Sequence, residues 1–328
     1  MLAALVLFEW MGQSFFFKHK LYFLDNVDHR IPPRSGPDIN SDGIRSRIEA
    51  NAIDDEDLNI VFLGDSFVYG YRLDFEDTIG QQLERKARME HPERDVHVIN
   101  FGWISSSPLL SYRLLRDIGE KYKPDFVVLG LDMSDFHDDI KYLKLLEREG
   151  IYRMMDIAPI TFLSVKRVIR RIGWLDEFYE WLYGFPSARF YSTDRTFTEN
   201  LTRFAYLRAN IDAIARFSRT ELDAQFILMI FPRNYQYSDL EAPNNWEKEQ
   251  YETLGPYALE PFKYFDSIRS ELDFPVFSLL PNFLKTEVFP TAFDDDPHWN
   301  KDGAYVAAEA VYAYCLEAGC FNAENNSR

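Results

Sequence analysis

Basic residues are scarce in this sequence of 328 residues, since 36 Lys and Arg stand against 53 Asp and Glu. The resulting formal net charge of −17 repels the phosphates of nucleic acids and of anionic lipid headgroups. We therefore expect no nucleic-acid partner. The simplest role of the negative charge is to keep the protein soluble.

Cysteine is almost absent, with only Cys315 and Cys320 near the C-terminus. Two cysteines five residues apart match no zinc-binding pattern, and we expect neither a metal nor a cofactor. The pair either forms a small local disulfide, if the protein is exported, or remains as two buried thiols.

A long hydrophobic run is also missing. Residues 1–8 are apolar, but Glu9 and Gln13 interrupt the segment before it reaches the length of a membrane span. No basic residue precedes it, as one would in a signal peptide. The segment is either the remnant of a membrane anchor or signal sequence, or a helix packed on the domain. Together with the Pro- and Gly-containing loop 31–37, it leads us to assign residues 1–58 to an N-terminal lead-in. We favour export or membrane association through the N-terminus over a cytoplasmic location.

The chain has ample material for a core, because 46% of its residues are hydrophobic and 16% are aromatic. Short, continuously apolar segments of the kind found in buried strands occur at 59–63, 96–100, 126–130, 225–231 and 275–279. Helical patterns lie between and after them at 78–89, 108–121 and 303–316, and 140–220 has the composition of a helical insertion. This alternation predicts an α/β fold, with a parallel five-stranded sheet in a three-layer α/β/α domain over 59–320.

Polar residues follow the first three predicted strands. Residues 64–66 read Gly-Asp-Ser, Gly102 follows the second strand, and Ser134 follows the third. Ligands of such sheets bind at the carboxyl ends of the strands. Near the C-terminus, His298 follows the three aspartates 294–296, in a predicted loop between the last strand and the last helix. A serine hydroxyl becomes a good nucleophile when a histidine takes its proton, and a carboxylate orients that histidine.

These segments resemble the motif blocks of the SGNH, or GDSL-type, hydrolases. Residues 64–67 (Gly-Asp-Ser-Phe) match the first block, and 100–102 (Asn-Phe-Gly) match the second. Residues 131–135 (Leu-Asp-Met-Ser-Asp) stand where the third falls, and 295–298 (Asp-Asp-Pro-His) match the last. Residues 39–45 (Ile-Asn-Ser-Asp-Gly-Ile-Arg) resemble the lead-in of envelope-associated bacterial members.

The resemblance spans residues 59 to about 315 and implies the flavodoxin-like fold of that class. It implies a Ser-His-Asp triad in which Ser66 is the nucleophile and His298 its base. The usual spacing of the class points to Asp295 as the orienting acid. Some envelope acyltransferase relatives place the acid two residues before the histidine, which is Asp296 here. Both remain open, with Asp295 favoured.

The resemblance also implies an oxyanion hole formed by the backbone N–H groups of Ser66 and Gly102. The third donor of the class is an Asn side chain, but Ser134, with its shorter hydroxyl, occupies that position here. We expect Asp65 and Asp135 to lie along the substrate cleft.

The acidic run after the third strand has a second interpretation as a cation site, because carboxylates suit calcium. Its spacing matches no EF-hand and no zinc signature, so we interpret it as a polar loop at the cleft rim. The run comprises Asp132, Asp135, His137, Asp138 and Asp139. A sugar or acyl pocket is expected further along, with ordinary helix packing as the alternative. Its candidates are Trp174, Trp181, Tyr183, Phe231, Arg233 and Tyr235.

These features together predict a serine esterase that removes small acyl groups, such as acetyl groups on carbohydrate, from a small-molecule or glycan ester. Transfer of the acyl group to a sugar hydroxyl would use the same serine. Because Ser134 replaces the usual Asn, a third interpretation is a catalytically weakened or inactive protein that acts in the binding or assembly of envelope polysaccharide.

Overall fold

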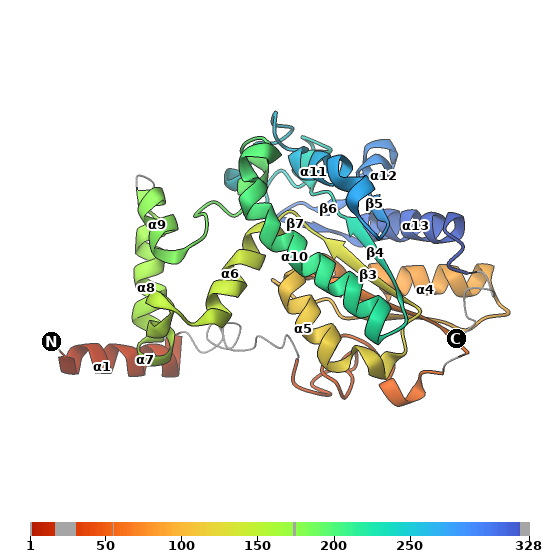
Figure 1. Ribbon diagram of the computed structural model, residues 1–328, viewed down its shortest axis with the longest axis horizontal. Helices are drawn as coiled ribbons and strands as arrows, with labels where there is room; N and C mark the ends of the chain where they lie inside the picture. Colours follow the sequence, from red (N-terminus) through yellow and green to blue (C-terminus); the bar gives the residue numbers. More distant parts are fainter. Residues whose placement is uncertain (1, 17–30, 55, 173–174, 322–328) are drawn as a thin grey trace.

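The computed structural model describes residues 2–16, 31–54, 56–172 and 175–321 (Figure 1). Five parallel strands form one sheet in the order β2-β1-β3-β4-β5. They are β1 (Leu58–Gly64), β2 (Val96–Asn100), β3 (Phe126–Leu131), β4 (Gln225–Ile230) and β5 (Val276–Ser278). This is the strand order of a flavodoxin-like doubly wound sheet, so the predicted fold class is confirmed.

Strand β1 is buried along its whole length, and its side chains alternate between the two faces of the sheet. Val61 and Leu63 face the core under α5 and α10, whereas Ile60 and Phe62 face the core under α4 and α13. The covering helices are α4 (Ile79–Glu90), α5 (Pro108–Ile118), α10 (Phe197–Glu221) and α13 (Lys301–Glu317). Apolar side chains on both faces of the strands thus account for the three layers.

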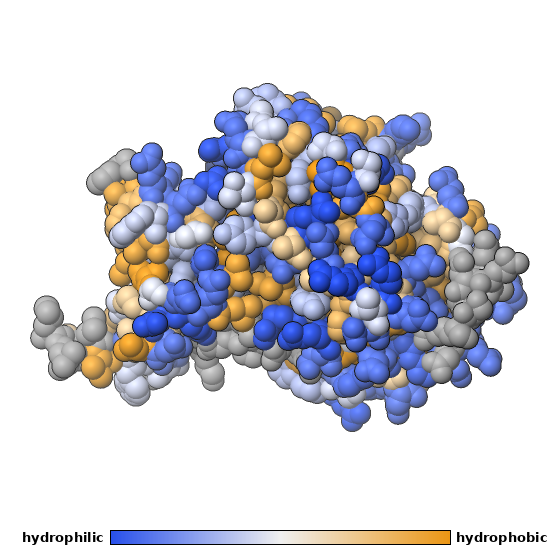
Figure 2. Space-filling model, in the orientation of Figure 1, coloured by the Kyte–Doolittle hydropathy of each residue, from blue (hydrophilic) through white to orange (hydrophobic). Residues whose placement is uncertain are grey.

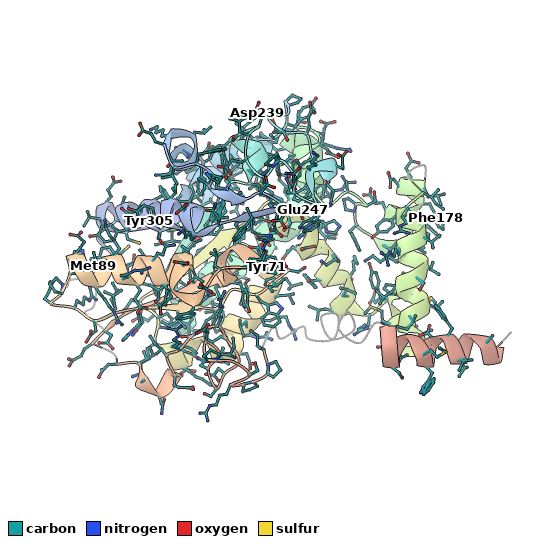
Figure 3. All side chains as sticks on the ribbon, turned by 180° about the vertical axis from the view of Figure 1, so that it is seen from behind. Tyr71, Met89, Phe178, Asp239, Glu247 and Tyr305 are labelled. Carbon is teal, nitrogen blue, oxygen red and sulfur yellow. The ribbon has the colours of Figure 1, made fainter. Side chains whose placement is uncertain are left out.

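A helical arm stands away from the sheet (Figure 1). It consists of α1 (Leu2–Met11), α7 (Met154–Ile157), α8 (Pro159–Arg170) and α9 (Asp176–Tyr183). Helix α6 (Asp135–Glu147) leads from the end of β3 towards it. Seen from behind, Phe178 lies on the arm, well apart from Tyr71 and Glu247 on the body (Figure 3). Helix α10 also falls within the predicted insertion, but it packs on α5 and β4 as part of the helical layer.

The N-terminal segment packs on this arm. The carboxylate of Glu9 accepts hydrogen bonds from the backbone N–H groups of Ile160 and Thr161, at 2.9 and 2.6 Å. These N–H groups open α8 and have no partner within their own helix. Glu9, the charged residue that interrupts the apolar N-terminal run, therefore caps α8.

Apolar side chains gather on the surface of the arm (Figure 2). Those exposed there include Phe8, Trp10, Val168, Phe178 and Trp181. Among the described residues, no helix combines the length and the apolar character needed to span a membrane. Of the predicted lead-in, residues 1, 17–30 and 55 lie outside the described part of the chain.

A short antiparallel hairpin precedes the last helix, where we expected a loop. Its strands are β6 (Ala292–Phe293) and β7 (Asp296–Trp299), and Asp294 and Asp295 form its turn. Arms this short, one of them containing Pro297, give no recognisable strand pattern in the sequence. The remaining short helices are α3 (Ser66–Tyr69), α11 (Glu260–Ile268) and α12 (Leu280–Lys285). Cys315 and Cys320 are buried free thiols.

Candidate active site

Ser66 stands at the carboxyl end of β1, as the first residue of α3. Asp65 caps this helix, because its Oδ1 accepts the backbone N–H of Phe67 at 2.9 Å. Gly64 makes the turn with a φ of 155°, and a Cβ there would come within 2.8 Å of the carbonyl oxygen of Gly130. The Gly-Asp-Ser sequence thus presents the serine hydroxyl at the edge of the sheet.

His298 comes from the C-terminal part of the chain and contacts Ser66. Its Nε2 lies 2.7 Å from the Oγ of Ser66, although 232 residues separate them in the chain. The imidazole packs between the rings of Phe67 and Tyr71, with centroids 4.9 and 5.0 Å away. These two aromatic contacts hold the ring in line with the hydroxyl.

The carboxylate on the other side of His298 belongs to Asp296. Its Oδ1 lies 2.5 Å from Nδ1 of His298 and also accepts the backbone N–H of that residue at 3.0 Å. Both residues lie on β7, and residues two apart on a strand project to the same side. Burial opposes ionisation of Asp296, but the hydrogen bond and charge of His298 outweigh it and lower the pKa of Asp296 to about 2.

Asp295, which we favoured as the orienting acid, does not contact the imidazole. It lies in the hairpin turn, its side chain is 65% exposed, and it accepts a hydrogen bond from Arg72 at 2.8 Å. The expected role of Asp295 assumes that this segment is a loop. Once the segment is a strand, Asp296 and His298 share one face and Asp295 falls outside it.

Gly102 packs against α3, the helix that Ser66 opens, and its backbone N–H is already engaged. It donates to Oδ1 of Asn100 at 2.8 Å, and Nδ2 of Asn100 donates to the carbonyl of Val68 at 2.8 Å. A Cβ at position 102 would come within 2.3 Å of the backbone nitrogen of Tyr69. The structure therefore shows a reason for glycine here that differs from the expected oxyanion contact: close packing of the second strand end against α3.

Ser134 is likewise turned away from the hydroxyl of Ser66. Its Oγ and its backbone N–H both donate to Oδ2 of Asp132, at 2.6 and 2.9 Å. Ser134 is buried, and it does not line the cavity in front of Ser66. The expected oxyanion role of this hydroxyl is not what the structure shows.

Asp65 and Asp135 are buried behind the site rather than lining the cleft. Burial, and after it the charge of Asp132, raise the pKa of Asp65 to about 7. Burial together with both neighbouring carboxylates raises the pKa of Asp135 well above its usual value. Asp132 differs because it receives two hydrogen bonds from Arg233, each 2.7 Å long. These bonds outweigh burial and lower the pKa of Asp132 to about 2.

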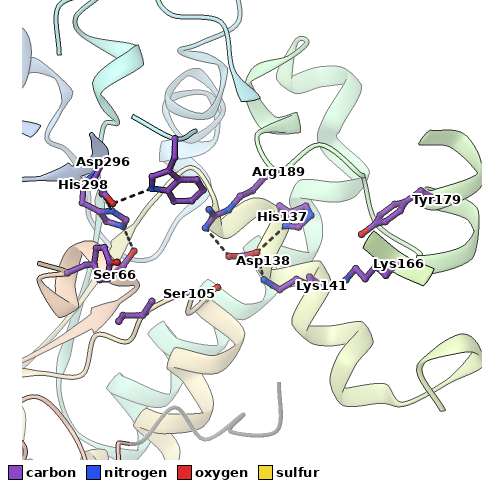
Figure 4. Close-up of a pocket in the computed structure, with 13 residues that line it drawn as sticks. Ser66, Ser105, His137, Asp138, Lys141, Lys166, Tyr179, Arg189, Asp296 and His298 are labelled. Carbon is purple, nitrogen blue, oxygen red and sulfur yellow. Dashed lines mark hydrogen bonds and ion pairs between the residues drawn. The ribbon is translucent and has the colours of Figure 1, made fainter. Parts of the chain in front are cut away.

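A cavity of about 470 Å³ opens in front of Ser66 and extends to the helical arm (Figure 4). Its volume is typical of small-molecule sites. Thirteen residues line it: Ser66, Tyr71, Ile104, Ser105, His137, Asp138, Lys141, Lys166, Tyr179, Arg189, Trp246, Asp296 and His298. It therefore has the Ser66 side chain at one end and residues of α6, α8 and α9 at the other.

No protein-family model matches the sequence, and no curated protein matches it either. Among solved structures, the chain is similar to a psychrotrophic esterase, EstA, from Pseudoalteromonas sp., with 17% identity and a TM-score of 0.45 over 80% of this chain and 98% of that one. It is similar to a carbohydrate acetylesterase family member from Sinorhizobium meliloti, with 14% identity and a TM-score of 0.42 over 80% and 100% of the two chains. A third is a member of the lipolytic protein G-D-S-L family from Veillonella parvula, with 11% identity and a TM-score of 0.42 over 79% and 97%.

A buried ionic network connects the cavity wall with the strand ends. Arg233 contacts both Asp132 and Glu247, and Glu247 also accepts a hydrogen bond from Arg189 at 2.5 Å. Nη2 of Arg189 lies 3.5 Å from Oδ2 of Asp138. The acidic run after β3 is thus buried instead of forming a polar rim, and two of its members, Asp132 and Asp138, are paired with arginines.

Several cavity residues were not predicted from the sequence. Trp246 and Arg189 lie in irregular segments that carry no periodic pattern, and Lys141 and Lys166 look like ordinary solvated positions of a helix. Of the pocket candidates that we did name, Arg233 belongs to the ionic network, and Trp174 lies outside the described residues. The other four, Trp181, Tyr183, Phe231 and Tyr235, do not line the cavity.

Proposed function

We propose that the protein is a serine esterase in which Ser66, His298 and Asp296 form the catalytic triad. The observation that carries the proposal is the unbroken chain of contacts from the Ser66 hydroxyl through the imidazole to the Asp296 carboxylate. It lies at the carboxyl edge of a parallel sheet and opens into a cavity.

In this proposal, Oγ of Ser66 attacks the ester carbonyl while Nε2 of His298 takes the hydroxyl proton. The tetrahedral intermediate collapses, the bond to the alcohol breaks, and the leaving oxygen receives that proton from His298. A water molecule then loses a proton to Nε2 and attacks the acyl-enzyme. The bond between the acyl group and Oγ breaks, the acid leaves, and Oγ takes the proton back from His298. Asp296 holds Nδ1–H throughout and stabilises the imidazolium that forms in each half.

The oxyanion would be stabilised by the backbone N–H of Ser66, which opens α3 and so has no partner within the helix. We propose Ser105 as the second hydrogen-bond donor to the oxyanion. It lines the same cavity beside Ser66 (Figure 4), and its φ of 61° is unusual for a residue other than glycine. The hydroxyl of Tyr142 donates to the Ser105 carbonyl and lies 3.1 Å from the Oγ of Ser105, so the Ser105 hydroxyl must turn from this partner to donate to the oxyanion.

Small acyl esters, including acetyl groups on carbohydrate, are the proposed substrates. Trp246 lines the cavity with 59% of its surface exposed, and Tyr71 lines it next to His298. Two accessible aromatic rings beside the triad suit the apolar face of a sugar or a short acyl chain. Transfer to a sugar hydroxyl in place of water uses the same groups, and analysis of products with and without an acceptor glycan separates the two reactions.

The test is labelling with a fluorophosphonate probe, which reacts with activated serines. We expect the wild type to be labelled and Ser66→Ala to be unlabelled, with His298→Ala reduced on the order of 1000-fold or more in rate. Circular dichroism of each variant controls for folding. A folded wild type that resists the probe would favour the alternative function, an inactive protein that binds envelope polysaccharide.

A further inference from the structure

A second cavity, of about 420 Å³, adjoins the one in front of Ser66. Tyr71 and Ile104 line both cavities, so these two half-buried side chains form the boundary between them. Both lie at the triad end of the first cavity, because Tyr71 packs against the ring of His298 and Ile104 directly precedes Ser105 (Figure 4). The triad therefore lies between the second cavity and the part of the first that extends to the helical arm.

The N-terminal lead-in supplies part of the wall of the second cavity. Residues 36–39 line it, together with residues 71–73, which follow α3. The segment 39–45, whose sequence resembles the lead-in of envelope-associated SGNH proteins, thus begins at this cavity and ends in Arg45, which also lines it. The lead-in takes no part in the triad, so its contribution to the site is this wall.

Arg45 holds the wall in place. Its side chain is buried and donates hydrogen bonds, each 2.8 Å long, to the backbone carbonyls of Tyr69, Gly70 and Leu73. Its guanidinium also lies 4.9 Å from the ring centroid of Tyr69. Because these charge-assisted bonds fix the turn after α3, the second cavity is preformed and a ligand need not order it.

The lining of the second cavity suits a sugar better than an acyl chain. It combines the half-buried rings of Tyr69 and Tyr71 with the polar side chains of Asp38 and Arg72. Aromatic rings pack on the apolar faces of sugars, and carboxylate and guanidinium groups can hydrogen-bond to sugar hydroxyls. Asp38 and Arg72 are already paired with other charged side chains, so the cavity does not require a charged ligand.

We propose that the second cavity binds a sugar unit next to the one that carries the ester, so that the substrate is a glycan chain acylated at an internal unit. This inference rests on the proposed function for the position of the ester at Ser66. The chain on one side of the acylated unit occupies the second cavity, and the chain on the other side extends towards the arm. A single pocket with the triad at its closed end would suit a terminal unit or a monosaccharide instead.

Binding of unacylated chains requires no turnover, which separates this inference from the esterase proposal. Isothermal titration calorimetry on the wild type would compare oligosaccharides of glucose, mannose, glucuronate and N-acetylglucosamine, each with two, four and six units. We expect the affinity in at least one series to rise about tenfold from two units to six. Equal affinity at all lengths, or no binding in any series, would overturn the inference.

Tyr69→Ala should lower the affinity for the six-unit chain about five- to tenfold, because it removes a ring that packs on the sugar. Tyr206→Ala is the matched control, since Tyr206 is 42% exposed on α10 and lines neither cavity. Gly36→Trp tests the same cavity by adding bulk. The nearest described atom to a Cβ at position 36, beyond its chain neighbours, is Cγ1 of Ile39 at 3.9 Å, so this variant should fold and obstruct the longer chains.

If both cavity variants bound the six-unit chain as tightly as the control, the second cavity would not be a sugar site and the inference would be wrong. This holds whatever the outcome of the fluorophosphonate test. A protein that resists the probe but binds longer chains more tightly, with the gain lost in the two variants, would retain the second cavity as a glycan site without the esterase activity.

Discussion

The indole Nε1 of Trp246 donates a hydrogen bond to Oδ2 of Asp296 at 3.3 Å. A residue that lines the cavity therefore also holds the carboxylate that orients His298, since Oδ1 of Asp296 faces the imidazole and Oδ2 faces the indole. We therefore expect Trp246 to have two roles: it contacts the substrate, and it positions the triad.

Trp246→Phe separates these two roles. It keeps an aromatic ring in the wall but removes the donor, so we expect kcat to fall about three- to tenfold with KM nearly unchanged. Steady-state kinetics on a small acyl ester would measure both. Trp181→Phe is the control, because Trp181 is 76% exposed on the arm and does not line the cavity. A rise in KM with constant kcat would mean that Trp246 acts only as cavity wall.

Asp296→Asn should lower kcat on the order of 1000- to 10,000-fold, because the amide no longer accepts the Nδ1 proton and the imidazole loses its orientation. Asp295→Asn should change kcat less than about threefold, since it only weakens an exposed ion pair with Arg72. Parallel kinetics of the two neighbouring variants would decide between the acids. A larger loss in Asp295→Asn would return the role to the residue that the family spacing favoured.

Two serines are candidates for the oxyanion donor that an Asn side chain supplies in the SGNH class. Ser105→Ala should lower kcat on the order of 100-fold if its hydroxyl stabilises the oxyanion. Ser134→Ala should leave kcat within about threefold but reduce the free energy of unfolding by about 1–2 kcal/mol, because Asp132 loses a buried hydrogen bond. Kinetics and urea unfolding on the same preparations test both. The reverse pattern would assign the donor to Ser134.

The pKa of Asp65, raised by burial to about 7, predicts a pH-dependent stability. An unfolded Asp has a pKa of about 3.9, so between roughly pH 4 and 7 the folded protein holds a proton that the unfolded chain does not. The stabilisation is complete below that window and is lost as the pH rises through it.

Asp65→Asn mimics the protonated carboxyl at every pH. We expect its Tm at pH 8 to exceed that of the wild type by roughly 5 °C, with the difference shrinking towards pH 5. Differential scanning calorimetry at both pH values would measure it. Asp239→Asn, at an exposed position (Figure 3), is the control and should show no such change. A constant offset between wild type and Asp65→Asn would show that Asp65 is ionised when folded.

The sequence predicts the sheet and the central pair of the site because these depend on local patterns. Continuous apolar runs indicate buried strands, and Ser66 and His298 stand next to recognisable motifs. The choice of Asp296 depended on the four-residue strand β7 and its two-residue partner β6, which are too short to leave a periodic signal. The partners that the structure gives to the N–H of Gly102 and the hydroxyl of Ser134 could not be predicted, because the contacts with Asn100 and Asp132 are set by the packing of the strand ends.

The cavity wall was the least predictable part. Lys166 faces the cavity only because α8 stands beside the body of the domain, and nothing in its own sequence neighbourhood specifies that placement. Arg189 and Trp246 come from irregular segments whose course depends on tertiary contacts with buried charges such as Glu247.

The carboxylate of Glu9 couples two helices of the arm, α1 and α8. By bonding the first N–H groups of α8, it couples α1 to that helix, and Gly12 permits the close approach, since a Cβ there would meet Ile160 at 2.7 Å. Lys166, which lines the cavity, lies on α8. The placement of the N-terminal helix is therefore structurally coupled to the cavity wall on the side away from Ser66.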